Sequence, residues 1–237
     1  MSEALFPIVV DCDAGQRAER LRRVYVEGTK LSLATVLPLA GGLAMLAHPL
    51  LTAWLGQSFS TTASIVQVLA WVVIVRVGAS TGSVILKGAG MHRHLTALVA
   101  AMAIANLGLS VVLAKPLGLI GVAVGTAVPV TLVAVMGYIP MACRRAQISF
   151  VELCRKAVWP AAWPAIIAAA VLYFTRSRMP VTLPSLAVQL AFSTAIYFLF
   201  FLLAIGGQSR RDYLRHIDGL LRRRPQELRP VGTVNAS

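Results

Sequence analysis

Residues 63–86 read ASIVQVLAWVVIVRVGASTGSVIL, a run of 24 residues that contains no Asp, Glu or Lys. A helix of roughly 17–25 apolar residues is long enough to cross the hydrocarbon core of a bilayer. Because the backbone finds no water there, a spanning segment must be a helix or part of a closed barrel. The run lacks the alternation of polar and apolar residues typical of barrel strands. It therefore predicts a transmembrane helix.

Five further runs share these properties, and all lack acids and Lys: 31–51, 95–114, 117–139, 157–174 and 184–206. Over the whole chain of 237 residues, 57% are hydrophobic, 13% are charged and the mean hydropathy is +0.75. A soluble domain of this length has too little core to bury so much apolar surface. We expect an all-α, polytopic bundle of about six transmembrane helices within 31–206.

The distribution of Lys and Arg predicts the orientation of this bundle. Eighteen of these residues fall in one set of connections and three in the other, and cytoplasmic loops carry the basic excess. Both ends of the chain are therefore expected on the cytoplasmic side. A net charge of +13 placed between apolar runs indicates contact with anionic lipid headgroups and no role with nucleic acid. The segments expected inside are 1–30, 87–94, 143–156 and 207–237.

Three of the segments expected on the cytoplasmic side have patterns that predict their structure in more detail. Residues 1–30 are expected to form a cytoplasmic basic linker, and 207–237 a basic cytoplasmic tail. Within 144–156 and 208–224, apolar residues share one stripe and basic residues take the other faces. This pattern favours amphipathic helices lying on the anionic leaflet. For the tail, a solvated basic end that only enforces orientation is an equally good interpretation.

Arg76 is the residue inside the spans that indicates function most directly. It lies about ten residues from either end of 63–86, and an Arg near the bilayer centre costs about 2.5–3.5 kcal/mol even on the more lenient insertion scale. Counted in helical steps, Ser80, Ser83 and Lys87 continue its face. The stripe favours the wall of a cavity that attracts an anion such as a phosphate or an acidic sugar. The alternative is an Arg that binds backbone carbonyls, or extends to the interface, and only holds the bundle together.

Catalytic and metal-binding patterns are missing from the sequence. Glu152 is the only carboxylate between Glu27 and Asp212, and it falls in a connection. Proton relays and carboxylate cation sites within the spans are therefore excluded. The three cysteines have no metal-ligand spacing, and no hydrolase or nucleotide-binding motif occurs. We expect neither an enzyme nor a protein with a cofactor or metal.

Helix-breaking and small residues occur within several spans. Pro38, followed by Gly41 and Gly42, interrupts the first span, and Pro129 interrupts the fourth. These positions are candidate hinges, because proline frees a carbonyl and bends a helix. Glycines at 121 and 125 have the GxxxG spacing that favours close helix packing in lipid. Asn106 in the third span either bonds to a neighbouring helix or lines the same cavity as Arg76.

Four stretches taken together resemble a known family. They are ALFPIVV (4–10), KLSLATVLPLAGGLAMLAHPLLTAWLGQSF (30–59), STTASIVQVLAW (60–71) and KPLGLIGVAVGTAV (115–128). Their order and spacing are similar to those of the polysaccharide flippases in the multidrug/oligosaccharidyl-lipid/polysaccharide exporter superfamily. The resemblance covers residues 4 to about 206.

The resemblance implies that the protein moves undecaprenyl-diphosphate-linked oligosaccharide across the bacterial inner membrane, by alternating access between two six-helix lobes, and that it is not an enzyme. Arg76, Ser80 and Ser83 would then face a cationic central cavity. Complete members have about twelve to fourteen spans. The chain thus resembles a carboxy-terminal half, with 4–10 as the stub of a preceding helix. It would need a missing amino-terminal lobe or a second copy as its partner.

Other interpretations of the sequence remain open. The chain is alternatively a half-size carrier of another anionic or amphipathic solute that works as a homodimer. A membrane-bound transferase acting on a polyprenyl lipid would need a donor site in a cytoplasmic loop, yet Glu152 is the only acid in the longest loop between spans. A membrane anchor or fragment without transport activity would not depend on Arg76.

Overall fold

The computed structural model describes residues 18–59, 62–176 and 181–204. Within these ranges the chain is helical and has no strand. Its elements are α2 (Ala18–Leu55), the 3₁₀ turn η2 (Gln57–Phe59), α3 (Thr62–Gly88), α4 (His92–Leu117), α5 (Leu119–Leu132), the π-helix η3 (Val133–Tyr138), α6 (Ile139–Arg145), α7 (Phe150–Leu153), the π-helix η4 (Cys154–Val158), α8 (Trp159–Arg176) and α9 (Leu183–Ala204).

Six helical segments in the described ranges are long and apolar enough to cross a membrane. Two of them are composite, since α5, η3 and α6 run on as one segment, and so do α7, η4 and α8. The prediction of an all-α, polytopic bundle with about six spans is confirmed. The protein is a multi-pass membrane protein.

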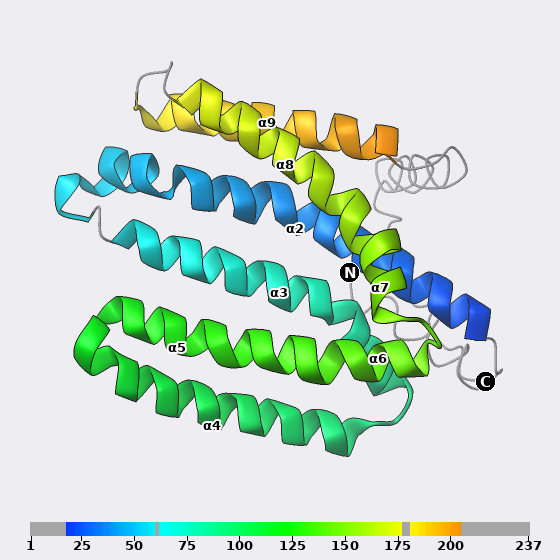
Figure 1. Ribbon diagram of the computed structural model, residues 1–237. Helices are drawn as coiled ribbons and strands as arrows, with labels where there is room; N and C mark the ends of the chain where they lie inside the picture. The colour runs from blue at the N-terminus through cyan, green and yellow to red at the C-terminus, as the bar shows by residue number, and fades with distance from the viewer. Residues whose placement is uncertain (1–17, 60–61, 177–180, 205–237) are drawn as a thin grey trace, which may run out of the picture. The chain divides into compact units, whose positions relative to one another are not determined.

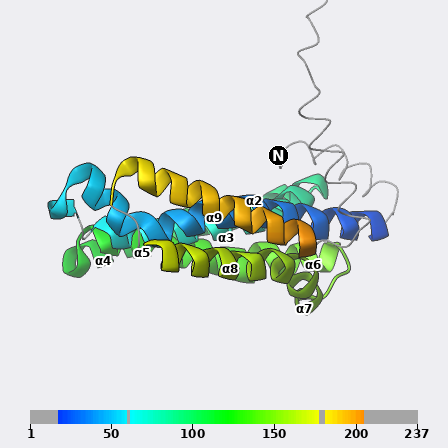
Figure 2. The same cartoon turned by 90° about the horizontal axis from the view of Figure 1, so that it is seen from above.

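The described residues up to Phe201 form one compact unit, in which the long helices run side by side along a common direction (Figures 1 and 2). The helix α2 packs against α3 on one side and α8 on the other, α3 packs against α5, and α5 packs against α4. The helix α9 reaches α8 through two buried hydrogen bonds to carbonyl oxygens. Ser193 Oγ donates to Ala168 at 3.2 Å, and the Tyr197 hydroxyl donates to Ala161 at 3.1 Å.

The second half of the expected linker 1–30 is helical and continuous with the first predicted span, because α2 begins at Ala18. Leu21, Tyr25 and Val26 recur at helical spacing and are buried in a core cluster with residues of α3 and α6. The charged residues between them mask this periodicity in a composition-based analysis. Residues 1–17, which include the expected stub at 4–10, lie outside the described part of the chain.

The amphipathic surface helix expected over 144–156 is also not formed. The helix α6 ends at Arg145, a short turn follows, and Phe150 begins the segment that continues to Arg176. Ile148 and Leu153 are buried in the same core cluster as Tyr25, which draws this segment into the bundle. The expected tail 207–237 lies outside the described residues.

One carboxylate joins α2 to the segment that begins at Phe150. Glu152 pairs with Arg22 of α2 and with Lys156, whose Nζ lies 2.6 Å from Glu152 Oε1. Arg22 and Glu152 are 130 residues apart in the sequence. The ion pairs therefore fix the start of α2 against a distant part of the chain.

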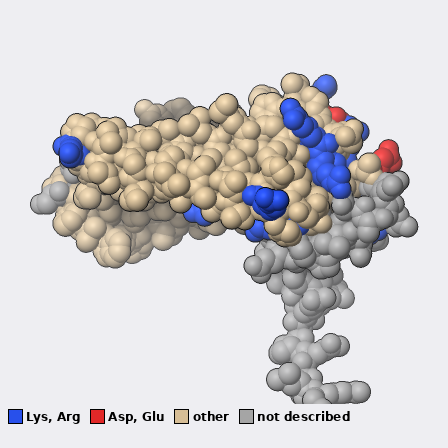
Figure 3. All heavy atoms as spheres, turned by 90° about the horizontal axis from the view of Figure 1, so that it is seen from below, with Lys and Arg blue, Asp and Glu red and all other residues tan. Residues whose placement is uncertain are grey.

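On the face shown in Figure 3, basic residues gather mainly at one end of the bundle, where α2 begins and α3 and α6 end, and few charged residues lie along its middle. Lys115 and Arg176 lie at the opposite helix ends. Because cytoplasmic loops of membrane proteins carry an excess of Lys and Arg, this distribution predicts that the basic end of the bundle lies on the cytoplasmic side. Among the described residues, the basic side chains at or near these helix ends are Arg20, Arg22, Arg23, Lys87, Arg93, Arg144, Arg145, Arg155 and Lys156.

The four candidate hinge residues occupy different surroundings. Pro38 is buried within α2, which continues without a break to Leu55. A side chain at Gly41 would meet no atom within 4 Å, whereas one at Gly42 would collide with Leu190 of α9. Pro129 lies one turn before the π-helix η3.

The helices α4 and α5 form a hairpin held by close backbone contact. A Cβ atom at Gly125 would lie 2.7 Å from Ser110 Cα, and one at Gly121 would collide with the carbonyl of Leu113. Only Leu95 of α4 is buried. The prediction that these glycines serve packing therefore fits the geometry, and α4 depends on α5 for most of its contacts.

Replacing Gly125 with Ala should weaken this hairpin. The added methyl group meets backbone atoms that have no room to move, and such overpacking costs about 1–3 kcal/mol. Thermal unfolding in detergent, followed by circular dichroism, should show a lower midpoint for Gly125→Ala. Gly108→Ala is the matched control, because a Cβ at Gly108 of α4 meets nothing within 4 Å. Equal midpoints for the two variants would contradict the packing role.

Candidate functional site

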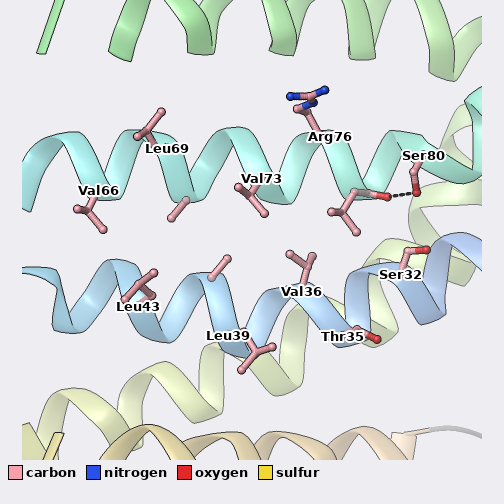
Figure 4. Close-up of a pocket in the computed structure, with 13 residues that line it drawn as sticks. Ser32, Thr35, Val36, Leu39, Leu43, Val66, Leu69, Val73, Arg76 and Ser80 are labelled. Carbon is pink, nitrogen blue, oxygen red and sulfur yellow. Dashed lines mark hydrogen bonds between the residues drawn. The ribbon is translucent and has the colours of Figure 1, made fainter. Parts of the chain in front are cut away.

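A groove of about 790 Å³ runs along the seam between α2 and α3 (Figure 4). The two helices are antiparallel, and the hydrogen bond from Gln67 Nε2 to the carbonyl of Ala44, 3.3 Å long, links them near one end of the groove. Most of the lining is aliphatic, with Leu39 and Leu43 from α2 and Val66, Leu69 and Val73 from α3.

The polar lining residues occupy one half of the groove. Ser32 and Thr35 come from α2, while Arg76 and Ser80 come from α3 (Figure 4). In each helix these residues lie nearer the end of the bundle where basic residues gather. The groove therefore changes along its length from an apolar half to a polar, cationic half. This arrangement suits a ligand that is itself amphipathic.

Arg76 is the only charged residue in the described lining of the groove. It is the fifteenth of the 27 residues of α3, and its side chain is exposed. Among the described residues it makes no ion pair and donates no hydrogen bond to a carbonyl. The sequence alternative of an Arg that bonds to backbone carbonyls therefore receives no support from these residues. The guanidinium is available to an anion.

The predicted polar stripe is shorter than the sequence indicates. Ser80 lines the groove, and its Oγ donates to the carbonyl of Val77 at 2.7 Å. Ser83 Oγ donates in the same way to the carbonyl of Ser80, and Ser83 is not among the lining residues. Lys87 is exposed in the last turn of α3, beyond the groove. Serine hydroxyls in helices commonly bond to a preceding carbonyl, which reduces their role as donors to a ligand.

Asn106 lies elsewhere, within the α4–α5 hairpin. Its Oδ1 accepts hydrogen bonds from Thr126 Oγ1 at 3.0 Å and from Ser110 Oγ at 3.1 Å. Of the two sequence interpretations, the bond to a neighbouring helix is the one that the geometry supports. A polar cluster of this kind strengthens helix association where the surroundings are apolar.

Sequence reasoning missed the contribution of α2 to the groove. Ser32 and Thr35 share a face with Leu39 and Leu43 at helical spacing, and this pattern is present in the sequence. What a single helix does not encode is which face its neighbour covers. Only the packing of α2 on α3 brings these residues into the lining of the same groove as Arg76 and Ser80.

No metal cluster of His, Cys, Asp or Glu occurs among the described residues. Comparison of the chain with protein-family models, curated proteins and solved structures found no match at any of the three levels. The groove itself is an open apolar channel with one cation, Arg76, in the lining of its polar half.

A cysteine at position 80 should report the potential that Arg76 creates in the groove. In a variant whose three native cysteines are replaced by Ala, Ser80→Cys should react faster with an anionic methanethiosulfonate than with a cationic one. Adding Arg76→Gln should lower the ratio of the anionic to the cationic reaction rate by about fivefold. One charge at roughly 8 Å in water speeds the anionic reagent and slows the cationic one, and the two effects together give this factor.

The matched control for this measurement is Gln57→Cys, an exposed position in the turn between α2 and α3. Its ratio of rates should not respond to Arg76→Gln. If the ratio at position 80 is also unchanged, or if the thiol at position 80 does not react from either side of the membrane, the groove is not a water-accessible cationic passage.

Proposed function

We propose that this chain forms one lobe of a transporter that moves an anionic, lipid-linked oligosaccharide across the bacterial inner membrane. The observation that carries the proposal is Arg76, an exposed cation near the middle of a spanning helix and beside an apolar groove. Holding a charge at such a position costs about 2.5–3.5 kcal/mol, so the residues that do so generally serve a substrate or ion pathway.

The two halves of the groove match the two parts of such a substrate. A diphosphate carries negative charge that a guanidinium binds with two parallel hydrogen bonds. A polyprenyl chain is hydrocarbon. The aliphatic half of the groove, which includes Leu39 of α2 and Leu69 of α3, is also apolar. The polar half lies toward the basic end of the bundle, so the headgroup would enter from the side proposed to be cytoplasmic.

The groove is open along one face of this unit, and a transport cycle needs a surface to close it. In secondary transporters the substrate site lies near the bilayer midplane between two repeats, which rock against each other. The second lobe would be supplied by further chain, a separate subunit or a second copy. The lining includes no carboxylate, imidazole or thiol among the described residues, which favours carriage of the substrate over catalysis.

Transport in reconstituted vesicles tests the proposal. The chain, together with its partner lobe where one is required, is placed in liposomes that carry a fluorescent polyprenyl-diphosphate saccharide. Accessibility of the fluorophore to an external quencher then measures movement between leaflets. Arg76→Gln should slow this movement by about tenfold or more, the loss of one hydrogen-bonded charge pair. Arg76→Lys should retain part of the rate, because it keeps the charge and loses the two-pronged contact.

Arg176→Gln in α8 is the matched control, since it removes the same side chain from a helix end outside the groove. It should transport at the rate of the unmodified protein. Equal rates for Arg76→Gln and the unmodified protein would refute the proposed function.

A further inference from the structure

The helices α3 and α5 run in the same direction, and two contacts fix their register. Trp71 Nε1 donates to Thr131 Oγ1 at 3.3 Å, across 60 positions of the sequence. A Cβ atom at Gly82 would lie 3.1 Å from the Cβ of Ala142, which is again 60 positions away. Between these two contacts, Tyr138 is therefore level with Gly78. Arg76 lies two residues from that level, or about 3 Å along the axis at 1.5 Å per residue.

Arg76 and Tyr138 therefore lie at nearly the same level on two helical segments, α3 and η3, that pack against each other. The Arg76 side chain projects from α3 on the side away from α2 (Figure 4), and η3 with Tyr138 is among the neighbours of α3. The Tyr138 ring packs against the core cluster that contains Tyr25. Its hydroxyl group makes no hydrogen bond within the described ranges.

The backbone before Tyr138 departs from a regular α-helix and lies close to α4. Tyr138 is the last residue of the π-helix η3, and single π-helical turns occur frequently at functional sites. The preceding Gly137 is buried, and a Cβ there would lie 3.1 Å from Leu98 of α4. The wider turn changes the angular position of the residues that follow it, so the periodicity of a regular helix does not predict where Tyr138 lies.

We infer that Tyr138 is a second donor of the anion site, beside Arg76, and that the site takes a phosphate or diphosphate group. This inference rests on the proposed function. A guanidinium supplies charge and two parallel N–H donors, and a tyrosine hydroxyl supplies one neutral donor. A tetrahedral phosphate has enough acceptor oxygens to bind both at once. The pair therefore binds phosphate more tightly than the cation alone.

Two ligand arms distinguish a free phosphate from one carried by a lipid. The protein in nanodiscs is titrated with inorganic pyrophosphate in the first arm and with polyprenyl diphosphate added to the nanodisc lipids in the second. Binding in the second arm alone identifies a lipid headgroup as the ligand. In whichever arm binds, Tyr138→Phe should weaken the affinity by about tenfold, since one hydrogen bond to a charged group is lost.

Tyr138→Phe keeps the ring, so its thermal midpoint without ligand should equal that of the unmodified protein. Tyr173→Phe is the matched control, because Tyr173 is an exposed residue of α8 outside the groove, and its affinity should not change. If Tyr138→Phe lowers the thermal midpoint enough to explain the whole loss of affinity, Tyr138 has a structural role. That result would overturn the inference.

The outcomes separate this inference from the proposed function. Full affinity in Tyr138→Phe together with a loss of binding in Arg76→Gln would overturn the role of Tyr138 and leave the proposed function standing. Full affinity in both variants would overturn both. Absence of binding in both arms by the unmodified protein would overturn the phosphate site itself.

Discussion

The energetic cost of Arg76 constrains how this protein is arranged in its membrane. A guanidinium near the middle of a spanning helix is unstable against hydrocarbon, and no acid lies in any predicted span to neutralise it. The face that carries it must therefore meet water, protein or an anion. The other exposed faces are aliphatic and aromatic, as on α4 and α9, and suit contact with lipid. One side chain thus distinguishes the face proposed to bind substrate from the faces suited to lipid.

The sequence was sufficient to predict the class of fold. Runs without acids or Lys in 63–86 and its five counterparts can be stable only as membrane helices, and all six helices are present. The sequence was insufficient where charged residues are interspersed with core residues. Residues 18–30 and 150–156 have enough Arg, Lys and Glu to resemble surface segments, yet Tyr25 and Leu153 anchor them in the core cluster.

The candidate site was predicted in part, for a related reason. Polar residues are costly within a span, so Arg76 and Ser80 can be recognised as candidate site residues from the sequence of their own helix. Ser32, Thr35 and Tyr138 are unremarkable residues for the ends of spans. Their relation to Arg76 arises from the register between helices, which contacts such as Trp71 to Thr131 set. The periodicity of one helix contains no information about its neighbour's register.

The hairpin of α4 and α5 has a consequence for how the bilayer acts on the protein. The helix α4 is attached to the bundle chiefly along the glycines of α5, and the rest of its circumference is apolar and uncovered by the described helices. Lipid tails are thus a larger part of its surroundings than protein is. Acyl-chain length and lateral pressure act on α4 directly, and through Leu98 and Gly137 their effect reaches the turn that ends at Tyr138. A change in bilayer thickness that displaced α4 would therefore first alter its contact with Gly137, the residue before Tyr138.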